Sequence, residues 1–215
     1  MHHSLIVQYP YETIDIALCQ NGLMLDFITL HKFDAIGKTI PSMQKLLESK
    51  NLTLLDIDFF GANIGPGPYN TLRAILTMLN GIHAVNKIPL IGLNALDLLS
   101  KELEEKNYLI ALNAFENHIF YKIQSNSKVL YGANSVQEAT NLINLQENEL
   151  IIHGNGAIKY QAQFKNCKKI VYPKEVLLFN KLETLAVLSY KKYTQNDFSS
   201  NYLKPIYFED LATNK

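Results

Sequence analysis

The chain has 215 residues, of which 47% are hydrophobic and 19% are charged, a composition typical of a globular protein rather than a disordered or fibrous one. Twenty basic residues balance twenty acidic ones, and a formal net charge of zero argues against a protein that holds nucleic acid by its own basic surface. Cys19 and Cys167 form no CxxC pair, which argues against a zinc or dithiol site. No apolar run approaches the roughly 20 residues of a membrane span, and no signal peptide is recognisable, so we expect a cytoplasmic protein.

The first half of the chain is predicted to form an antiparallel meander followed by alternating helices and strands. Residues 14–18 alternate apolar and polar side chains as a half-buried strand does, and Asn21-Gly22 is a strong hairpin signal. The expected strands are Leu5–Val7, Ile14–Leu18, Leu23–Leu30, Asp58–Ala62 and Pro89–Leu93, and the expected helices are about Thr39–Lys50, Asn70–Asn86 and Asn94–Lys106.

The second half repeats this order in a smaller form. Ser135 and Glu138 form a capping box that predicts a helix start. The expected strands are Tyr108–Leu112, Ile119–Gln124, Val129–Tyr131 and Leu150–His153, and the expected helices are Ser135–Leu145 and Lys174–Lys192, before a loosely attached tail from Tyr202 to Lys215. The pattern predicts a duplicated α/β architecture with mixed sheets, divided into residues 1–106 and a smaller lobe of residues 107–215.

A Gly/Pro-rich loop joins a predicted strand to the longest helix and is the most informative segment. It runs through Gly65, Pro66, Gly67 and Pro68. A loop at a helix N-terminus can bind an anion, but proline has no N–H to donate and the Gly-Lys-Ser/Thr ending of a phosphate loop is absent. A tight structural turn is therefore the simpler interpretation. Arg73 follows this loop as the only arginine of a lysine-rich chain, and we expect it to hold the loop or to reach a partner carboxylate.

Residues suited to catalysis are sparse. Apart from the adjacent His2 and His3, which we expect to be disordered, no histidines have ligand-like spacing, and no Gly-x-Ser-x-Gly elbow occurs. The paired lysines at 168–169 and 191–192 are most simply solvated. The sequence therefore predicts no catalytic residue, no metal site and no cofactor-binding residue.

The helix predicted at Asn70–Asn86 is apolar over most of its circumference. At 100° per residue its polar side chains form one narrow stripe of Asn70, Arg73, Thr77 and Asn80. One apolar flank consists of Leu72, Ile75, Leu76 and Leu79, and the other of Ala74, Met78, Gly81, Ile82 and Val85. An ordinary surface helix has one apolar stripe, so this helix needs burial on two sides. Either both flanks are covered within the chain, or one flank binds a partner; we favour the flank with Met78 as the contact.

The segment from Asp56 to Leu96 resembles the signature of the TsaB family, also called YeaZ. The matching residues are Asp56-Ile57-Asp58, Gly65-Pro66-Gly67, Arg73, Gly81, Ile88-Pro89-Leu90-Ile91-Gly92 and Ala95-Leu96. Weaker similarity continues at Gly154-Asn155-Gly156-Ala157 with Tyr160 and at Lys204-Pro205-Ile206-Tyr207. The sequence departs from the family at the end of the first strand, where Gln8 stands, within the loop at residues 68–71, and at Asn113-Ala114-Phe115.

The resemblance implies an actin-like, ribonuclease H-like duplicated fold and a catalytically silent subunit. Such a subunit binds and stabilises TsaD, which transfers threonylcarbamoyl to the tRNA adenosine beside the anticodon, and the ATPase TsaE joins the complex. It also implies that the long helix and the preceding one, here with Met43, pair with TsaD or with a second copy in a homodimer, and that tRNA is contacted only indirectly. The alternative is a stand-alone actin-like kinase or ATPase, against which Gln8 argues because an amide supplies no negative charge for magnesium. A third alternative is a peptidase related to TsaD, but this sequence lacks the metal ligands that such a protein would need.

Overall fold

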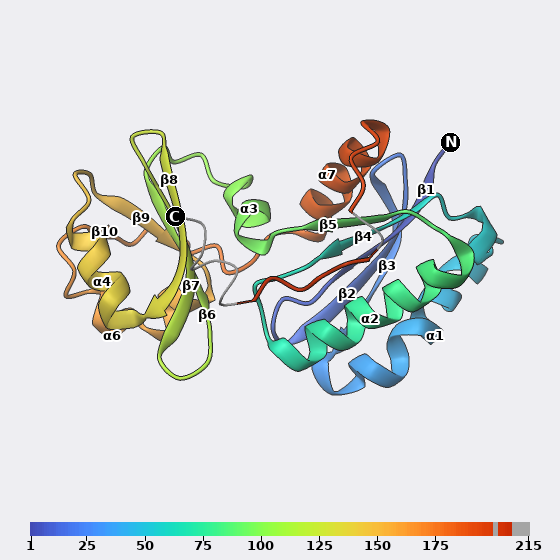
Figure 1. Cartoon of the computed structure of the whole chain (residues 1–215), viewed down its shortest axis with the longest axis horizontal. Coiled ribbons are helices and arrows are strands. Elements are labelled where there is room, and N and C mark those ends of the chain that lie inside the picture. The colour runs from blue at the N-terminus through green and yellow to red at the C-terminus, as the bar shows by residue number, and fades with distance from the viewer. Residues whose placement is uncertain (200–201, 208–215) are drawn as a thin grey trace. The chain divides into compact units, whose positions relative to one another are not determined.

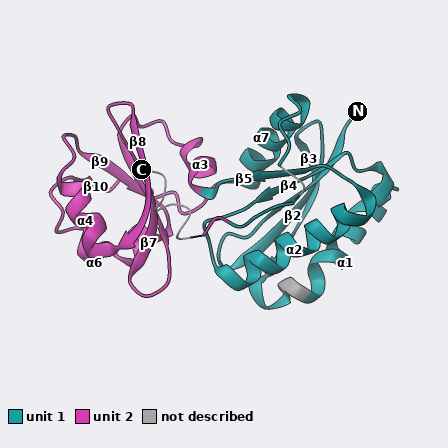
Figure 2. Cartoon of the chain, in the orientation of Figure 1, with its two compact units in different colours: residues 1–95, 181–205 teal, residues 96–180, 206–215 magenta. Residues whose placement is uncertain are grey.

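The computed structural model describes residues 1–199 and 202–207, and of residues 35 and 36 it describes the backbone alone. The chain divides into two compact units, drawn in different colours in Figure 2. Of the described residues, unit 1 combines residues 1–95 with residues 181–199 and 202–205, and unit 2 consists of residues 96–180 with residues 206 and 207. Each unit contains one five-stranded mixed sheet.

The sheet of unit 1 has the strand order β3-β2-β1-β4-β5. Its strands are β1 (His3–Gln8), β2 (Thr13–Gln20), β3 (Leu23–His31), β4 (Phe59–Asn63) and β5 (Leu90–Leu93). The first three strands pair antiparallel, whereas β4 and β5 run parallel to β1. Asn21 and Gly22 form the predicted hairpin turn, with φ of 50° and 81°, the left-handed region that a two-residue turn of this kind requires.

Helices cover both faces of this sheet (Figure 1). α1 (Ala35–Glu48) and α2 (Tyr69–Asn86) contact one another and share one apolar core with the sheet, and α7 (Leu182–Thr194) lies on the opposite face. Two short 3-10 helices, η1 (Lys32–Asp34) and η2 (Leu54–Asp56), flank α1. Gly61 of β4 makes the approach of α7 possible, because a Cβ atom there would lie 2.5 Å from Ser189 Oγ.

The sheet of unit 2 repeats the same topology, with the order β10-β9-β6-β7-β8. Its strands are β6 (Tyr108–Asn113), β7 (His118–Ser125), β8 (Lys128–Ser135), β9 (Leu150–His153) and β10 (Ile170–Val171), and the helices between them are α4 (Val136–Asn144), α5 (Asn155–Lys159) and α6 (Gln161–Phe164). β6 to β8 pair antiparallel, and β9 and β10 run parallel to β6. The duplicated α/β fold predicted from the sequence is therefore confirmed, as is the capping box of Ser135 and Glu138.

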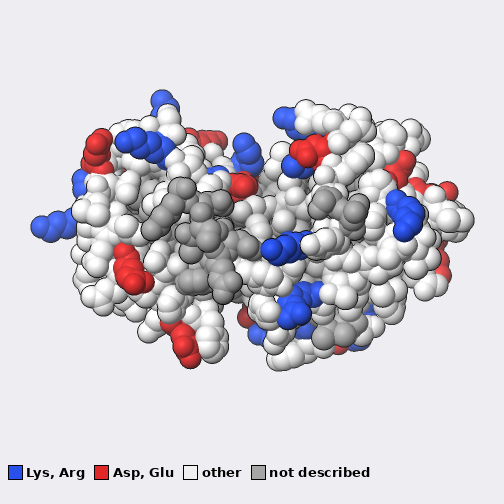
Figure 3. Space-filling view, viewed as in Figure 1, with Lys and Arg blue, Asp and Glu red and all other residues white. Residues whose placement is uncertain are grey.

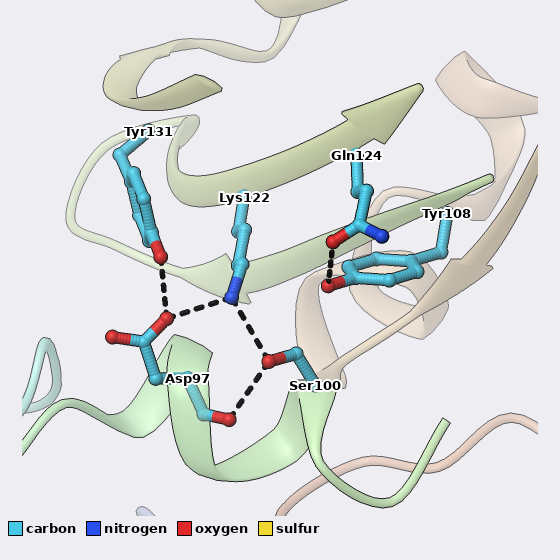
Figure 4. A network of polar contacts seen from close by, with 6 residues as sticks. All are labelled: Asp97, Ser100, Tyr108, Lys122, Gln124 and Tyr131. Atoms are coloured by element: carbon cyan, nitrogen blue, oxygen red, sulfur yellow. Dashed lines mark hydrogen bonds and ion pairs between the residues drawn. The ribbon is translucent and has the colours of Figure 1, made fainter. Parts of the chain in front are cut away.

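The compact units differ from the predicted division at residues 106 and 107, because the last helix of each repeat packs with the other unit. α7 follows the strands of unit 2 but contacts the sheet of unit 1. α3 (Ala95–Ser100) follows β5 but is fixed to unit 2, where Lys122 of β7 donates hydrogen bonds to Asp97 at 2.7 Å and to Ser100 at 2.9 Å. Tyr131 of β8 donates to the same oxygen of Asp97 (Figure 4). The order of the elements along the chain does not reveal that α7 belongs to unit 1 and α3 to unit 2.

Three local predictions were wrong. Residues 174–181 are not helical, because the N–H of Leu177 donates to His153 and its carbonyl accepts from Gly154, which leaves these groups unavailable for helical pairing. His3 is not disordered but begins β1, and its N–H donates to Asp58 at 2.8 Å. Part of the predicted tail is firmly held, since Leu203 is only 2% exposed, while residues 208–215 lie outside the described residues.

Candidate functional site

The loop between β4 and α2 is a closed structural turn. Gly65 has φ of +94°, which favours glycine, and its N–H donates to Asn63 Oδ1 at 2.8 Å. Its carbonyl accepts from the N–H of Ala95 at 2.7 Å. Pro66 and Pro68 have no N–H, so the loop offers few donors to an anion. The structural interpretation of this loop is therefore favoured over a phosphate cradle.

The two apolar flanks of α2 have different surroundings. The flank predicted to face the core does so, with Leu72, Ile75, Leu76 and Leu79 all buried. On the other flank, Val85 is 80% exposed, Gly81 is exposed, and Ala74, Met78 and Ile82 are half-buried. The described chain therefore leaves this second flank, called the Met78 flank below, partly uncovered.

Two predicted contact residues fit the Met78 flank less well. Met43 of α1 is 4% exposed and belongs to the apolar core beneath the helices, so it is not available to a partner; its expected role was wrong. Ile82 packs against the same core from the edge of the flank. Among the described side chains of α1, Ile40 is a large apolar one that is exposed, at 47%.

Gly81 has no steric reason within the chain to be glycine. A Cβ atom built there meets nothing within 4 Å, and the residue lies in a regular helix at negative φ. Glycine in a helix interior costs roughly 1 kcal/mol relative to alanine. A bare backbone at this point is explained if another surface approaches it closely.

Arg73 lies over the ring of Tyr69, the last residue of the Gly65–Tyr69 loop that it is expected to hold. Its guanidinium carbon is 4.9 Å from the ring centroid, and Nη1 donates to the tyrosine hydroxyl at 2.9 Å. Tyr69 is 51% exposed and Arg73 is exposed. The pair thus presents a rigid cationic and aromatic surface at the first turn of α2, next to the Met78 flank.

The ends of the two equivalent strands β1 and β6 carry amides. Gln8 donates to Asp15 Oδ2 at 3.1 Å, and the second oxygen of Asp15 accepts from Thr29 at 2.9 Å. At the end of β6, Asn113 Oδ1 accepts from Lys159 at 2.8 Å and from Tyr160 at 3.0 Å. A carboxylate in these places would suit a hard cation, whereas a neutral amide already bonded to its neighbours does not.

The described residues contain no cluster of three or more metal-ligating side chains. His153, which is 2% exposed, accepts from the N–H of Leu177 through Nδ1 and therefore carries its proton on Nε2, which faces Glu105 at 3.4 Å. Burial lowers the pKa of His153, and the carboxylate of Glu105 opposes this only in part. Its bonds join three segments of unit 2, which indicates a structural role.

Sequence reasoning missed the link between α2 and the C-terminal segment. Asn80, predicted as part of a polar stripe, donates to the carbonyl of Leu203 at 2.9 Å and accepts from its N–H at 2.6 Å. Ser199 bonds the edge strand β5 through the carbonyl of Leu90 and the N–H of Gly92. A lone asparagine in an amphipathic helix gives no signal of such a distant partner.

Comparisons with known proteins agree with this topology. The family model "TsaD: tRNA N6-adenosine threonylcarbamoyltransferase" matches residues 36–202. A tRNA threonylcarbamoyladenosine biosynthesis protein TsaB from Buchnera aphidicola subsp. Schizaphis graminum is 25% identical over 158 residues, which cover 66% of this chain and 75% of that protein. Two structures from Pseudomonas aeruginosa are similar at 15% identity: a protein with similarity to peptidase YEAZ, with a TM-score of 0.73 over 97% of this chain and 100% of that one, and YeaZ itself, with 0.70 over 96% and 100%.

The two repeated sheets and these matches define a protein of the duplicated actin-like α/β class. The chain belongs to the TsaD family, whose model spans most of its length. Within that family it is a TsaB (YeaZ) member, as the motif from Asp56 to Leu96 predicts. Among the described residues, no helix is long and apolar enough to cross a membrane.

Proposed function

We propose that this protein is a non-catalytic subunit of the machinery that installs threonylcarbamoyl on tRNA, and that it binds and stabilises TsaD through the Met78 flank of α2. The observation that carries the proposal is the exposed part of that flank, with Val85 80% exposed and Gly81 open to solvent. The relative from Buchnera aphidicola is named for threonylcarbamoyladenosine biosynthesis, and the matching family model is that of the transferase.

The chemistry of the contact follows from its side chains. Ala74 and Gly81 are small and permit close approach of a partner helix, and Met78 adapts its shape to the surface it meets. Val85 extends the exposed apolar area on α2, and Ile40 is an exposed apolar side chain of α1. Arg73, stacked on Tyr69, would lie at the rim, where its planar fork can bind a partner carboxylate. A second copy of the chain could occupy the same flank when TsaD is absent.

The lack of catalytic chemistry is supported at both strand ends. Gln8 and Asn113 are neutral, and both are engaged by neighbouring side chains of their own unit. The rival function, a stand-alone kinase or ATPase, requires magnesium and nucleotide at such a position. Calorimetric titration with Mg-ATP is expected to give no micromolar affinity; tight binding would favour the rival.

The contact is tested by introducing a charge into the flank. Met78→Asp is expected to abolish co-elution with TsaD, because an unpaired charge buried at an interface costs several kcal/mol, on the order of 3 to 5. Thr77→Asp adds the same charge at the neighbouring exposed position of the polar stripe and is the matched control. Thermal melting verifies that both variants fold.

The outcomes are distinct. A folded Met78→Asp protein that still binds TsaD like the wild type would show that the flank is not the contact. A Met78→Asp protein that unfolds while Thr77→Asp remains folded would show that Met78 serves the core of unit 1 instead.

TsaE is expected to join only the assembled complex, and tRNA binding by the isolated chain at physiological salt is expected to be weak, since its net charge is zero. Figure 3 shows basic and acidic side chains interspersed over one face.

A further inference from the structure

A stretch of unit 2 has a charge pattern unlike the rest of this neutral chain. Residues 150–174 contain five lysines and no aspartate or glutamate. The five are Lys159, Lys165, Lys168, Lys169 and Lys174. The acidic residues that bound the stretch are Glu149 and Glu175, so the excess of positive charge belongs to one continuous segment.

None of these five lysines forms an ion pair within the described residues. In unit 1, by contrast, Lys32, Lys38, Lys50 and Lys192 each pair with a carboxylate at 2.6 to 3.9 Å. Lys159 and Lys169 donate instead to neutral oxygens, the amide of Asn113 and the carbonyl of Glu147. The carboxylate of Glu147 accepts from Asn126. Among the described residues, none of the five lysines is therefore held in a direct ion pair with a carboxylate.

These lysines lie on the part of the chain that leads from the end of α5 to the edge strand of the unit 2 sheet and just beyond it. The segment forms α5, α6 and the edge strand β10, which pairs only with β9 among the described strands. Lys165, Lys168 and Lys174 are exposed. Exposed Gln163 and Asn166 lie among them and add neutral hydrogen-bond donors, which together with ammonium groups suit phosphate oxygens.

We propose that this lysine edge, formed by residues 159–174, contacts the phosphate backbone of tRNA. A polyanion is the partner that five lysines without an ion pair among the described residues fit, and the matching family model names a tRNA-modifying transferase. The contact supplies position rather than sequence recognition, because it reaches phosphates and not bases. It is direct, in contrast to the purely indirect contact that the family resemblance implies. It rests on the tRNA link of the proposed function but not on the Met78 flank.

The test compares two triple variants that lose the same charge. One removes the exposed lysines of the edge by the substitutions Lys165→Gln, Lys168→Gln and Lys174→Gln. The control removes three exposed lysines of the same unit that lie outside the edge, by the substitutions Lys101→Gln, Lys106→Gln and Lys128→Gln. Filter binding of an unmodified tRNA transcript to the full chain is measured from about 50 to 200 mM salt, the range over which phosphate contacts weaken strongly.

The logarithm of the affinity falls with the logarithm of the salt concentration. In the edge variant this fall is expected to be shallower, by about 2 to 3 in slope, since each lost phosphate contact removes about 0.7 to 0.9. The control is expected to change it by less than about 1. Equal losses in both variants would overturn the proposal, because net charge alone would then explain binding, and so would the absence of binding by the wild type at low salt. Competition by polyglutamate as strong as by tRNA would assign the edge to an acidic protein instead. Retention of tRNA binding by Met78→Asp would keep this result separate from the TsaD contact.

Discussion

The substitution Gly81→Ala is expected to act with opposite signs on folding and on assembly. Gly81 lies in the interior of α2, is exposed, and has open space where a Cβ atom would stand. Alanine in an exposed helix interior is favoured over glycine by about 0.8 to 1.0 kcal/mol. For a chain of this length, 1 kcal/mol corresponds to a rise in melting temperature of about 2 to 4 °C. The isolated protein should therefore become more stable.

Assembly should respond in the other direction. If a partner helix approaches the backbone at Gly81, a methyl group there overpacks the contact, and an overpacked methylene costs about 1 to 3 kcal/mol. That cost weakens the affinity for TsaD by about 5- to 150-fold, at a factor of ten for every 1.4 kcal/mol. Thr77→Ala is the matched control, because it also raises helix propensity but lies on the exposed polar stripe.

Melting of the isolated chain and calorimetric titration with TsaD measure the two effects. A stabilised Gly81→Ala protein with wild-type affinity would refute the close approach at this position. A destabilised Gly81→Ala protein would refute the open space from which the argument starts.

Three further perturbations probe individual contacts. Arg73→Lys loses the planar stacking on Tyr69 and should cost about 0.5 to 1 kcal/mol, seen as a lower melting temperature or weaker TsaD binding; wild-type values in both would contradict it. The pKa of His153 in the folded chain lies below its unfolded value of about 6.5, so its contribution to stability is complete above that pH and is lost as pH falls. In urea titrations, His153→Gln should therefore weaken the dependence of the free energy of unfolding on pH. Asp97→Ala leaves the buried ammonium of Lys122 unpaired and should cost about 3 to 5 kcal/mol, whereas Lys122→Met leaves only a half-exposed carboxylate and should cost much less; equal losses in urea titrations would contradict this asymmetry.

Local signals in the sequence predicted most of the fold correctly. The strand at residues 14–18, the Asn21-Gly22 turn and the capping box at Ser135 each depend on neighbouring residues and were confirmed, although residues 16–18 are all buried rather than alternating. The buried flank of α2 followed from helical periodicity in the same way. What failed depends on distant partners: α7 packs with the first unit, and the N–H and carbonyl of Leu177 pair with residues of the β9 end rather than within a helix.

The candidate site was only partly readable for the same reason. Helical spacing identifies which residues share a flank, but not whether α1 already covers one of them. Met43 of α1 was therefore assigned to a partner contact, although its side chain is buried in the core of unit 1. The hydrogen bonds between Asn80 and the backbone of Leu203 gave no signal in the sequence. The pairing of Gln8 with Asp15 also required the antiparallel register of β1 and β2.

That pairing gives the final prediction, which concerns a carboxylate introduced at the end of β1. Gln8 is 4% exposed, and its amide donates to Asp15. Gln8→Asp would place a second carboxylate near the first, within a buried strand end, and like charges in such proximity raise the pKa of one of them. The substitution should therefore destabilise the chain by about 1 to 3 kcal/mol more than Gln8→Ala, which removes the amide without adding a charge.

The difference between the two variants is expected at neutral pH in EDTA and should shrink toward about pH 4, where carboxyl groups take up protons. Equal stability of both variants at neutral pH would show that the strand end can accept a carboxylate and that Gln8 is not fixed by Asp15. The expected result would mean that the neutral amide of Gln8 is part of the packing of unit 1, because a carboxylate in its place disturbs the neighbouring strand.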